Sequence, residues 1–246
     1  AVSQPAEFVT IQALAGLTAV ISLRQLTQRS ELFRAILIVL AVSVLTYISI
    51  QLINRRVLYI EDVNYSDLIS ISISCLLLMV SYLLLIPIER VLGFTSNVTL
   101  IELSNANNPL LRRMSEEAPG TFQHSMQVAN LAAEVANNLM AKSQLVRTGA
   151  LYHDIGKLEN PVFFTENQSG VNPHDGLPLE KSAQIIIRHV TDGLKLADKY
   201  KLPQAVKDFI ATHHGTSMAK YFYISYKNKY PDREPDPKLF TYPGPN

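Results

Sequence analysis

Two long uncharged runs near the start of the chain limit its possible folds more than any other feature of the sequence. Residues 35–53 and 68–88 are apolar apart from isolated Ser, Thr, Tyr, Gln, Cys and Pro residues. A helix needs about 20 such residues to cross the hydrocarbon core of a bilayer, and neither run has the polar stripe of a soluble amphipathic helix. We therefore predict transmembrane spans near 35–53 and 68–88, and a shorter one near 8–23. The alternative is a set of buried helices in a soluble core.

The polarity of the chain changes along its length and predicts its division into parts. Most apolar runs lie before residue 93, and the first lysine is Lys142. We predict a transmembrane region over 1–92, a connector over 93–120 with a short helix from Val98 to Leu103, and a polar domain over 121–246. Because the chain starts at an alanine and stops just after Tyr-Pro-Gly-Pro, we expect a piece of a longer protein, truncated at both ends.

Composition excludes several classes of protein. The single cysteine, Cys75, lies inside an apolar run, so neither a disulfide framework nor a cysteine-based zinc site can form within one chain. The net charge is +1, and no basic cluster resembles a surface that follows a phosphate backbone. We therefore expect no nucleic acid polymer as a partner, whereas the apolar runs predict contact with a lipid bilayer.

The arginines near the spans predict an orientation in the membrane. Arginine and lysine are favoured in the cytoplasmic loops of membrane proteins. With the polar half in the cytoplasm, the inner arginines are Arg24, Arg29, Arg34, Arg90, Arg112 and Arg113, and the outer ones are Arg55 and Arg56. We therefore predict a multi-pass membrane protein with its polar domain in the cytoplasm.

The polar half has the periodicity of helices. Apolar residues recur at three- and four-residue steps from residue 121 to 140, and helices are also expected near 143–151, 182–200 and 203–214. Thr121 is a candidate N-cap, which places His124 in the first helical turn, and Gly156 suits a left-handed C-terminal cap. Strand-like alternation is missing, so we predict an all-α fold.

Five of the six histidines and one aspartate form an ordered series that predicts a metal site. The series is His124, His153-Asp154, His189 and His213-His214. A single helical histidine is more often a hydrogen-bonded structural residue, but histidine is also the commonest metal ligand, and six candidates with two adjacent pairs favour ligation. Neighbours on a helix point about 100° apart, so His153 and Asp154 can reach adjacent positions in one cavity.

The adjacency of these residues further indicates two metal ions. A carboxylate can bridge two cations, whereas one imidazole nitrogen binds one, so Asp154 is the expected bridge. Lys157, in the same His-Asp-Ile-Gly-Lys stretch, contacts a substrate phosphate or is a solvated surface lysine. The sixth histidine, His174, lies in Asn-Pro-His-Asp-Gly and is interpreted as a loop residue.

Several longer motifs carry a resemblance to a known family. The series with its His-Asp-Ile-Gly core resembles the HD superfamily of metal-dependent phosphohydrolases. The chain more closely resembles the seven-transmembrane HD receptors, the PgpH-type cyclic di-AMP phosphodiesterases of bacteria. The resemblance is dense over residues 90–246, through Glu117–Ser125, Gly149–Lys157, Glu166–Gln168, Asn172–Asp175, Ile185–Val190, Thr212–Thr216 and Tyr242–Pro245.

This resemblance implies an activity, a site and a location. The activity is hydrolysis of cyclic di-AMP to linear pApA, with Asp154 and Lys157 as catalytic residues, at a centre of two manganese or iron ions in a protein of the bacterial plasma membrane. His124 and His153 hold one metal, His189, His213 and His214 hold the other, and Asp154 bridges them. The family also has an aspartate in an Ala-Asp motif beyond Tyr-Pro-Gly-Pro that completes the first metal's shell. The chain as given should therefore bind that metal poorly and could be inactive as a fragment.

Other functions remain open at this point. The substrate could be cyclic di-GMP or an alarmone such as ppGpp, although the cyclic di-GMP branch has Gly-Tyr-Pro after its His-His pair and this chain has Gly215-Thr-Ser. A receptor that binds a nucleotide without catalysis is a second alternative. A membrane anchor with a structural metal is a third, disfavoured because such sites are typically four-coordinate and rich in cysteine. A homodimer formed through the connector is possible.

Overall fold

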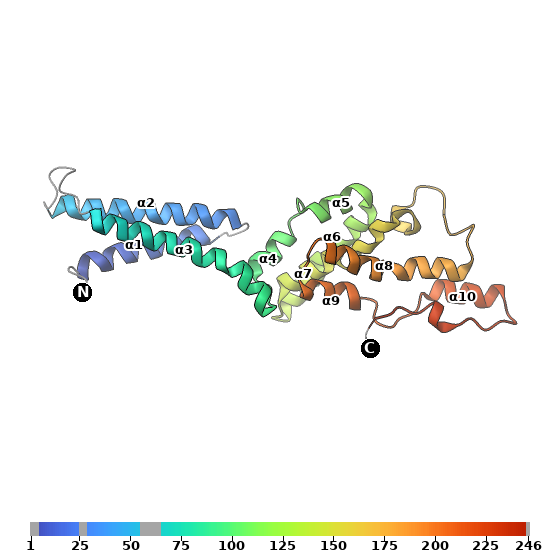
Figure 1. The fold of residues 1–246 in the computed structure, drawn as a ribbon. Coiled ribbons are helices and arrows are strands. Elements are labelled where there is room, and N and C mark those ends of the chain that lie inside the picture. Colours follow the sequence, from blue (N-terminus) through green and yellow to red (C-terminus); the bar gives the residue numbers. More distant parts are fainter. Residues whose placement is uncertain (1–4, 25–28, 55–64, 245–246) are drawn as a thin grey trace. The chain divides into compact units, whose positions relative to one another are not determined.

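The structure of this protein is a computed structural model that describes residues 5–24, 29–54 and 65–244. Arg55 and Arg56, which enter the predicted orientation, lie outside these ranges. The described residues are mostly helical, as predicted, and contain one isolated β-bridge, between Met218 and Thr241. The chain falls into two compact units, Ala1–Val98 and Thr99–Asn246, which Figure 1 shows as a ribbon.

The first unit consists, in its described part, of three long helices: α1 (Pro5–Leu23), α2 (Arg29–Ile53) and α3 (Tyr65–Leu92). Helix α1 packs against α2, and α2 packs against α3. Each predicted apolar span lies within one of these helices. Two stretches, Pro5–Leu23 and Glu31–Ile53, are long and apolar enough to cross a membrane, and the apolar stretch of α3, Tyr65–Val80, is shorter. Helix α1 has no buried residue, which does not fit a helix in a soluble core.

The second unit, which carries the histidine series, is built in its described part from α-helices. They are α4 (Asn97–Leu103), α5 (Pro109–Glu117), α6 (Pro119–Asn138), α7 (Ser143–Tyr152), α8 (Leu179–Lys199), α9 (Gln204–Thr212) and α10 (Lys220–Lys229), with 3₁₀ turns η2 (Ile155–Glu159), η3 (Pro161–Phe163), η4 (Thr165–Asn167) and η5 (Pro237–Leu239). The four helices predicted over the polar half correspond to α6, α7, α8 and α9. Helices α5 and α10 were not predicted.

One hydrophobic core holds these helices together. Its largest fully buried side chains come from α5, α7, η2 and α9 and are those of Leu110, Leu111, Met114, Leu151, Tyr152, Ile155, Val206 and Ile210. Helix α6 packs extensively against α7, and η2 packs against α8. The predicted connector thus contributes buried side chains, and the Tyr152 hydroxyl donates a hydrogen bond to the Leu103 carbonyl at 2.7 Å. This core fixes the ends of α7 and α9, from which four of the six candidate ligands project.

Two predictions about local structure were wrong. Helix α6 begins at Pro119 with Ala118 as its N-cap, so Thr121 lies inside the helix and His124 in its second turn. Gly156 lies in η2 and is absent from the residues with positive φ. The reason for glycine there is packing: a Cβ would lie 1.8 Å from the His189 carbonyl oxygen and 2.4 Å from the Gly193 nitrogen.

Candidate metal centre

The fold brings all six predicted ligands together. His124 comes from α6, His153 and Asp154 follow the end of α7, His189 lies in α8, and His213 and His214 follow the end of α9. They form two groups that share Asp154, and the ligand atoms within each group lie within 4.8 Å of one another. One group consists of Asp154, His189, His213 and His214, and the other consists of His124, His153 and Asp154.

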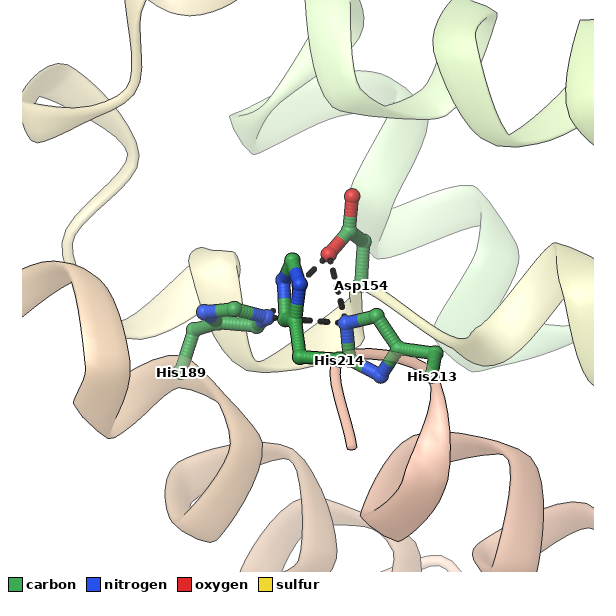
Figure 2. Close-up of side chains that lie close together, drawn as sticks. All are labelled: Asp154, His189, His213 and His214. Atoms are coloured by element: carbon green, nitrogen blue, oxygen red, sulfur yellow. Dashed lines mark hydrogen bonds and ion pairs between the residues drawn. The ribbon is translucent and has the colours of Figure 1, made fainter. Parts of the chain in front are cut away.

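The Asp154 carboxylate faces both groups, with a different oxygen toward each. Its Oδ1 lies 3.3 Å from His189 Nε2 and 3.6 Å from His213 Nε2. Its Oδ2 lies 3.1 Å from His153 Nε2 and 3.9 Å from His124 Nε2. Figure 2 shows the first group, with one oxygen directed at the histidine rings and the other pointing away from them. This is the arrangement that a carboxylate bridging two cations requires.

Backbone hydrogen bonds orient three of the imidazole rings in the same way. In each, Nδ1 pairs with the carbonyl oxygen three residues earlier, at 2.6–2.9 Å: His153 with Ala150, His189 with Ile186, and His213 with Ile210. A carbonyl can only accept, so Nδ1 carries the proton and Nε2 of the neutral ring keeps its lone pair. Metal-binding histidines are commonly held by such a second hydrogen bond.

These lone pairs converge on a point that suits a cation. His189 Nε2 and His213 Nε2 are 3.1 Å apart, and both lie near Asp154 Oδ1. With both Nδ1 atoms protonated, neither Nε2 has a hydrogen to donate to the other. Three acceptors at this separation repel one another unless a cation lies between them. Histidine and carboxylate donors suit divalent iron, manganese or zinc, so the residues present fit a metal ion.

The histidines around Asp154 favour the deprotonated carboxylate at the centre. Asp154 is 3% exposed. Although burial raises the pKa of Asp154, in the metal-free protein any proton on a facing Nε2 atom of His153, His189 or His213 is donated to this carboxylate, and such hydrogen bonds hold the pKa of Asp154 well below its ordinary value. Burial lowers the pKa of His153, but its hydrogen bond to Asp154 and the charge of that carboxylate raise the pKa overall. The carboxylate is therefore ionised near neutral pH, the form that binds metal.

Lowering the pH is expected to destabilise the metal-free protein through His214. Burial, with the charges of His213 and His189, lowers the pKa of His214 from 6.5 to about 4. The unfolded chain therefore binds this proton at a higher pH than the folded protein, so the free energy of unfolding falls as the pH drops from 6.5 toward 4. Thermal melting of EDTA-treated protein over this range measures the effect. We expect His214→Asn to flatten the dependence, and an equally steep one in that variant would contradict the prediction.

Tyr242 covers the ligand group that contains His214. Its ring stacks on that of His214, with centroids 4.0 Å apart and an interplanar angle of 17°. Its backbone N–H donates to Ser217 at 2.9 Å, and the Gly244 N–H donates to Gly215 at 3.2 Å. The segment 241–244 therefore lies against the loop that follows His213-His214. Sequence reasoning assigned this tyrosine no role beyond a family motif, because a contact between such distant segments has no periodic signal.

Lys157 and Glu166 extend the centre on the side of Asp154 Oδ2. The Lys157 ammonium lies 2.9 Å from Asp154 Oδ2 and 2.7 Å from Glu166 Oε1. Its side chain is 14% exposed, so the alternative of a solvated surface lysine was wrong. Burial lowers the pKa of Lys157, but the two carboxylates raise it overall, and the ammonium stays charged. Sequence reasoning assigned no role to Glu166. His174 belongs to neither ligand group and pairs with the Phe163 carbonyl.

Comparison with protein families and relatives identifies the two parts of the chain. Residues 1–96 match the family described as a 7TM receptor with intracellular HD hydrolase, and residues 121–240 match the HD domain. The second match contains all six candidate ligands.

Full-length relatives match almost the whole chain. It is 38% identical over 238 residues to the cyclic-di-AMP phosphodiesterase PgpH of Listeria monocytogenes and 37% identical over 234 residues to PgpH of Bacillus subtilis. Each match covers 94% of this chain and 32% of the relative, so the chain spans about a third of their length.

A solved structure gives the same result for the second unit. The crystal structure of the L. monocytogenes PgpH HD domain in complex with cyclic-di-AMP matches 57% of this chain and 65% of its own, at 46% identity and a TM-score of 0.54. Taken together, the matches to both parts show that the chain belongs to the family of seven-transmembrane receptors with an intracellular HD hydrolase domain.

Proposed function

We propose that this protein hydrolyses cyclic di-AMP to linear pApA at a centre of two divalent metal ions. The observation that carries the proposal is the Asp154 carboxylate, which presents Oδ1 to His189 and His213 and Oδ2 to His153. The substrate is inferred from the relatives named as cyclic-di-AMP phosphodiesterases and from the related HD domain in complex with cyclic-di-AMP. We further propose that the ions are manganese or iron.

The metal ions and the protein have separate parts in this chemistry. When bound, two divalent ions would lower the pKa of a coordinated water and would neutralise charge on the phosphate oxygens. Asp154 and the five histidines of the two groups would hold the ions. Lys157 has three N–H donors, of which two face the carboxylates of Asp154 and Glu166. We propose that the third donates to a phosphate oxygen of the substrate.

The two ligand groups are not equivalent. Among the described residues, the group of His189 offers four ligands and the group of His124 offers three. His124 also has the most exposed side chain of the ligands in ion-pair contact with Asp154, at 49%. We therefore expect the metal ion at His124 and His153 to bind more weakly, so activity is best tested in the native full-length protein.

We also propose a location for the two units. The apolar helices of the first unit, with the match to a 7TM family, support a multi-pass protein of the bacterial plasma membrane. We place the HD unit in the cytoplasm, because that is where the arginine distribution puts it and where a cyclic dinucleotide messenger is found.

The substrate choice is tested with the native full-length protein in detergent and Mn²⁺. Cyclic di-AMP and cyclic di-GMP are supplied separately, and the products are separated by liquid chromatography. We expect pApA to form, with cyclic di-GMP consumed at least about tenfold more slowly, and EDTA to stop both reactions. Preferential loss of cyclic di-GMP would overturn the substrate assignment. Tight binding of cyclic di-AMP without hydrolysis would instead support a receptor without catalysis.

A further inference from the structure

Glu166 connects the start of α6 to the metal centre. Its Oε1 accepts hydrogen bonds from the Thr121 hydroxyl at 3.1 Å and from the Lys157 ammonium at 2.7 Å. The same ammonium lies 2.9 Å from Asp154 Oδ2, the oxygen that faces His153 and His124. One carboxylate outside both ligand groups thus acts, through a single lysine, on the residue that the two groups share.

The segment that carries Glu166 is held tightly on α6. The Thr121 backbone N–H donates to Asn167 Oδ1 at 3.2 Å, and Asn167 Nδ2 donates to the Thr121 hydroxyl at 2.8 Å. Thr121 is fully buried. A Cβ on Gly120 would lie 1.9 Å from the Glu166 carbonyl oxygen, so the two backbones are in direct contact. These contacts leave little freedom for the Glu166 backbone.

The ligand group that Glu166 serves is the less constrained one. Nδ1 of His153 forms a hydrogen bond with a backbone carbonyl. Within the described part of the chain the His124 ring has no bond of this kind, and its side chain is 49% exposed. The position of His124 therefore depends on how α6 is docked. Thr121 lies three residues before His124, on the same face of the helix, so the contact with Glu166 and Asn167 acts close to this ligand.

Charge gives Glu166 a second effect on the same group. The Lys157 ammonium beside Asp154 Oδ2 repels a cation bound to that oxygen. Glu166 supplies a second negative charge at 2.7 Å from the ammonium, which offsets that repulsion in a site where Lys157 is largely shielded from water. Without the Glu166 carboxylate, Asp154 alone would balance the positive charge of Lys157, and Asp154 would be a poorer metal ligand.

We propose that Glu166 is a positioning residue of the metal centre, which anchors and neutralises Lys157 so that His124, His153 and Asp154 can hold a divalent cation. The inference rests on the two-metal centre of the proposed function and adds to it a residue that touches neither metal nor substrate. It predicts an effect confined to one of the two metal sites. The group of His189, His213 and His214 is expected to keep its affinity.

The test is a Mn²⁺ titration of the native full-length protein in detergent, followed by electron paramagnetic resonance, which distinguishes a lone Mn²⁺ from a coupled pair. In Glu166→Gln, which keeps the size of the side chain, we expect one ion to bind as in the wild type and the other 10–100-fold more weakly, as is typical when a partner of a metal ligand is lost. Glu159→Gln, an exposed glutamate in η2, is the matched control and should bind both ions normally.

A double variant shows whether the weaker metal binding comes from the charge of Lys157 or from a general loss of structure. Lys157→Met/Glu166→Gln removes both charges. In this double variant the affinity for the more weakly bound ion should return to within about threefold of the affinity in Lys157→Met. Unchanged binding in Glu166→Gln, loss of both ions in that variant, or a double variant as weak as Glu166→Gln would each overturn the inference. A wild type that binds two ions but leaves cyclic di-AMP intact would contradict the proposed activity and leave this inference standing.

Discussion

Replacement of Asp154 by asparagine is expected to lower the rate of cyclic di-AMP hydrolysis by at least about 10³-fold. Asparagine has nearly the same size, but its amide has one acceptor oxygen in place of two and no charge. It cannot face His189 and His213 with one acceptor oxygen and His153 with the other, as the carboxylate does. Both metal sites should therefore lose affinity together, which is a different pattern from the single-site loss expected for Glu166→Gln.

The control for this substitution is Asp192→Asn. Asp192 is also buried, at 6% exposure, but it pairs with Arg188 and Lys195 on α8 and belongs to neither ligand group. We expect it to bind two Mn²⁺ ions and to keep a rate within about threefold of the wild type. Metal content by mass spectrometry and initial rates at saturating Mn²⁺ give both readouts. A rate close to that of the wild type in Asp154→Asn would rule out the bridging role.

The sequence allowed the candidate centre to be predicted because its chemistry depends on residue type and adjacency. His153-Asp154 and His213-His214 are neighbours in the chain, and both pairs follow the last turn of a helix that periodicity had located. A helix end that is fixed in a core carries the next two side chains to a defined place. For this reason the six candidate ligands converge in the structure as the series suggested.

The residues that support the centre could not be found in the same way. Glu166 acts on Thr121, which is 45 residues away, and Tyr242 acts on His214 from a segment without regular structure. Neither contact leaves a periodic pattern in the sequence. Thr121 illustrates the resulting error. A threonine before an apolar run suggests an N-cap, but its hydroxyl donates a hydrogen bond to Glu166 in η4 instead. Such side chains are recognised only when the segments are seen together.

Gly156 shows how a glycine can be placed correctly and explained wrongly. The sequence predicted a left-handed cap after α7, but Gly156 lies in η2 and does not have a positive φ. A Cβ at this position would lie 1.8 Å from the His189 carbonyl oxygen and 2.4 Å from the Gly193 nitrogen. Both atoms belong to the backbone of α8, so no rotation of a side chain can relieve the contact. Glycine is needed here because η2 and α8 touch through their backbones, and α8 carries the ligand His189.

Gly156→Ala is therefore expected to destabilise the second unit by on the order of 3 kcal/mol, which corresponds to a fall in melting temperature of roughly 6 °C or more. Because α8 must move away from η2, His189 should also shift from Asp154, and metal affinity should fall with stability. Gly176→Ala is the matched control: a Cβ there has no atom within 4 Å, and its φ is not positive. Thermal melting followed by circular dichroism, with and without Mn²⁺, measures both effects. Equal melting temperatures for the two variants would show that the contact between η2 and α8 is not the reason for this glycine.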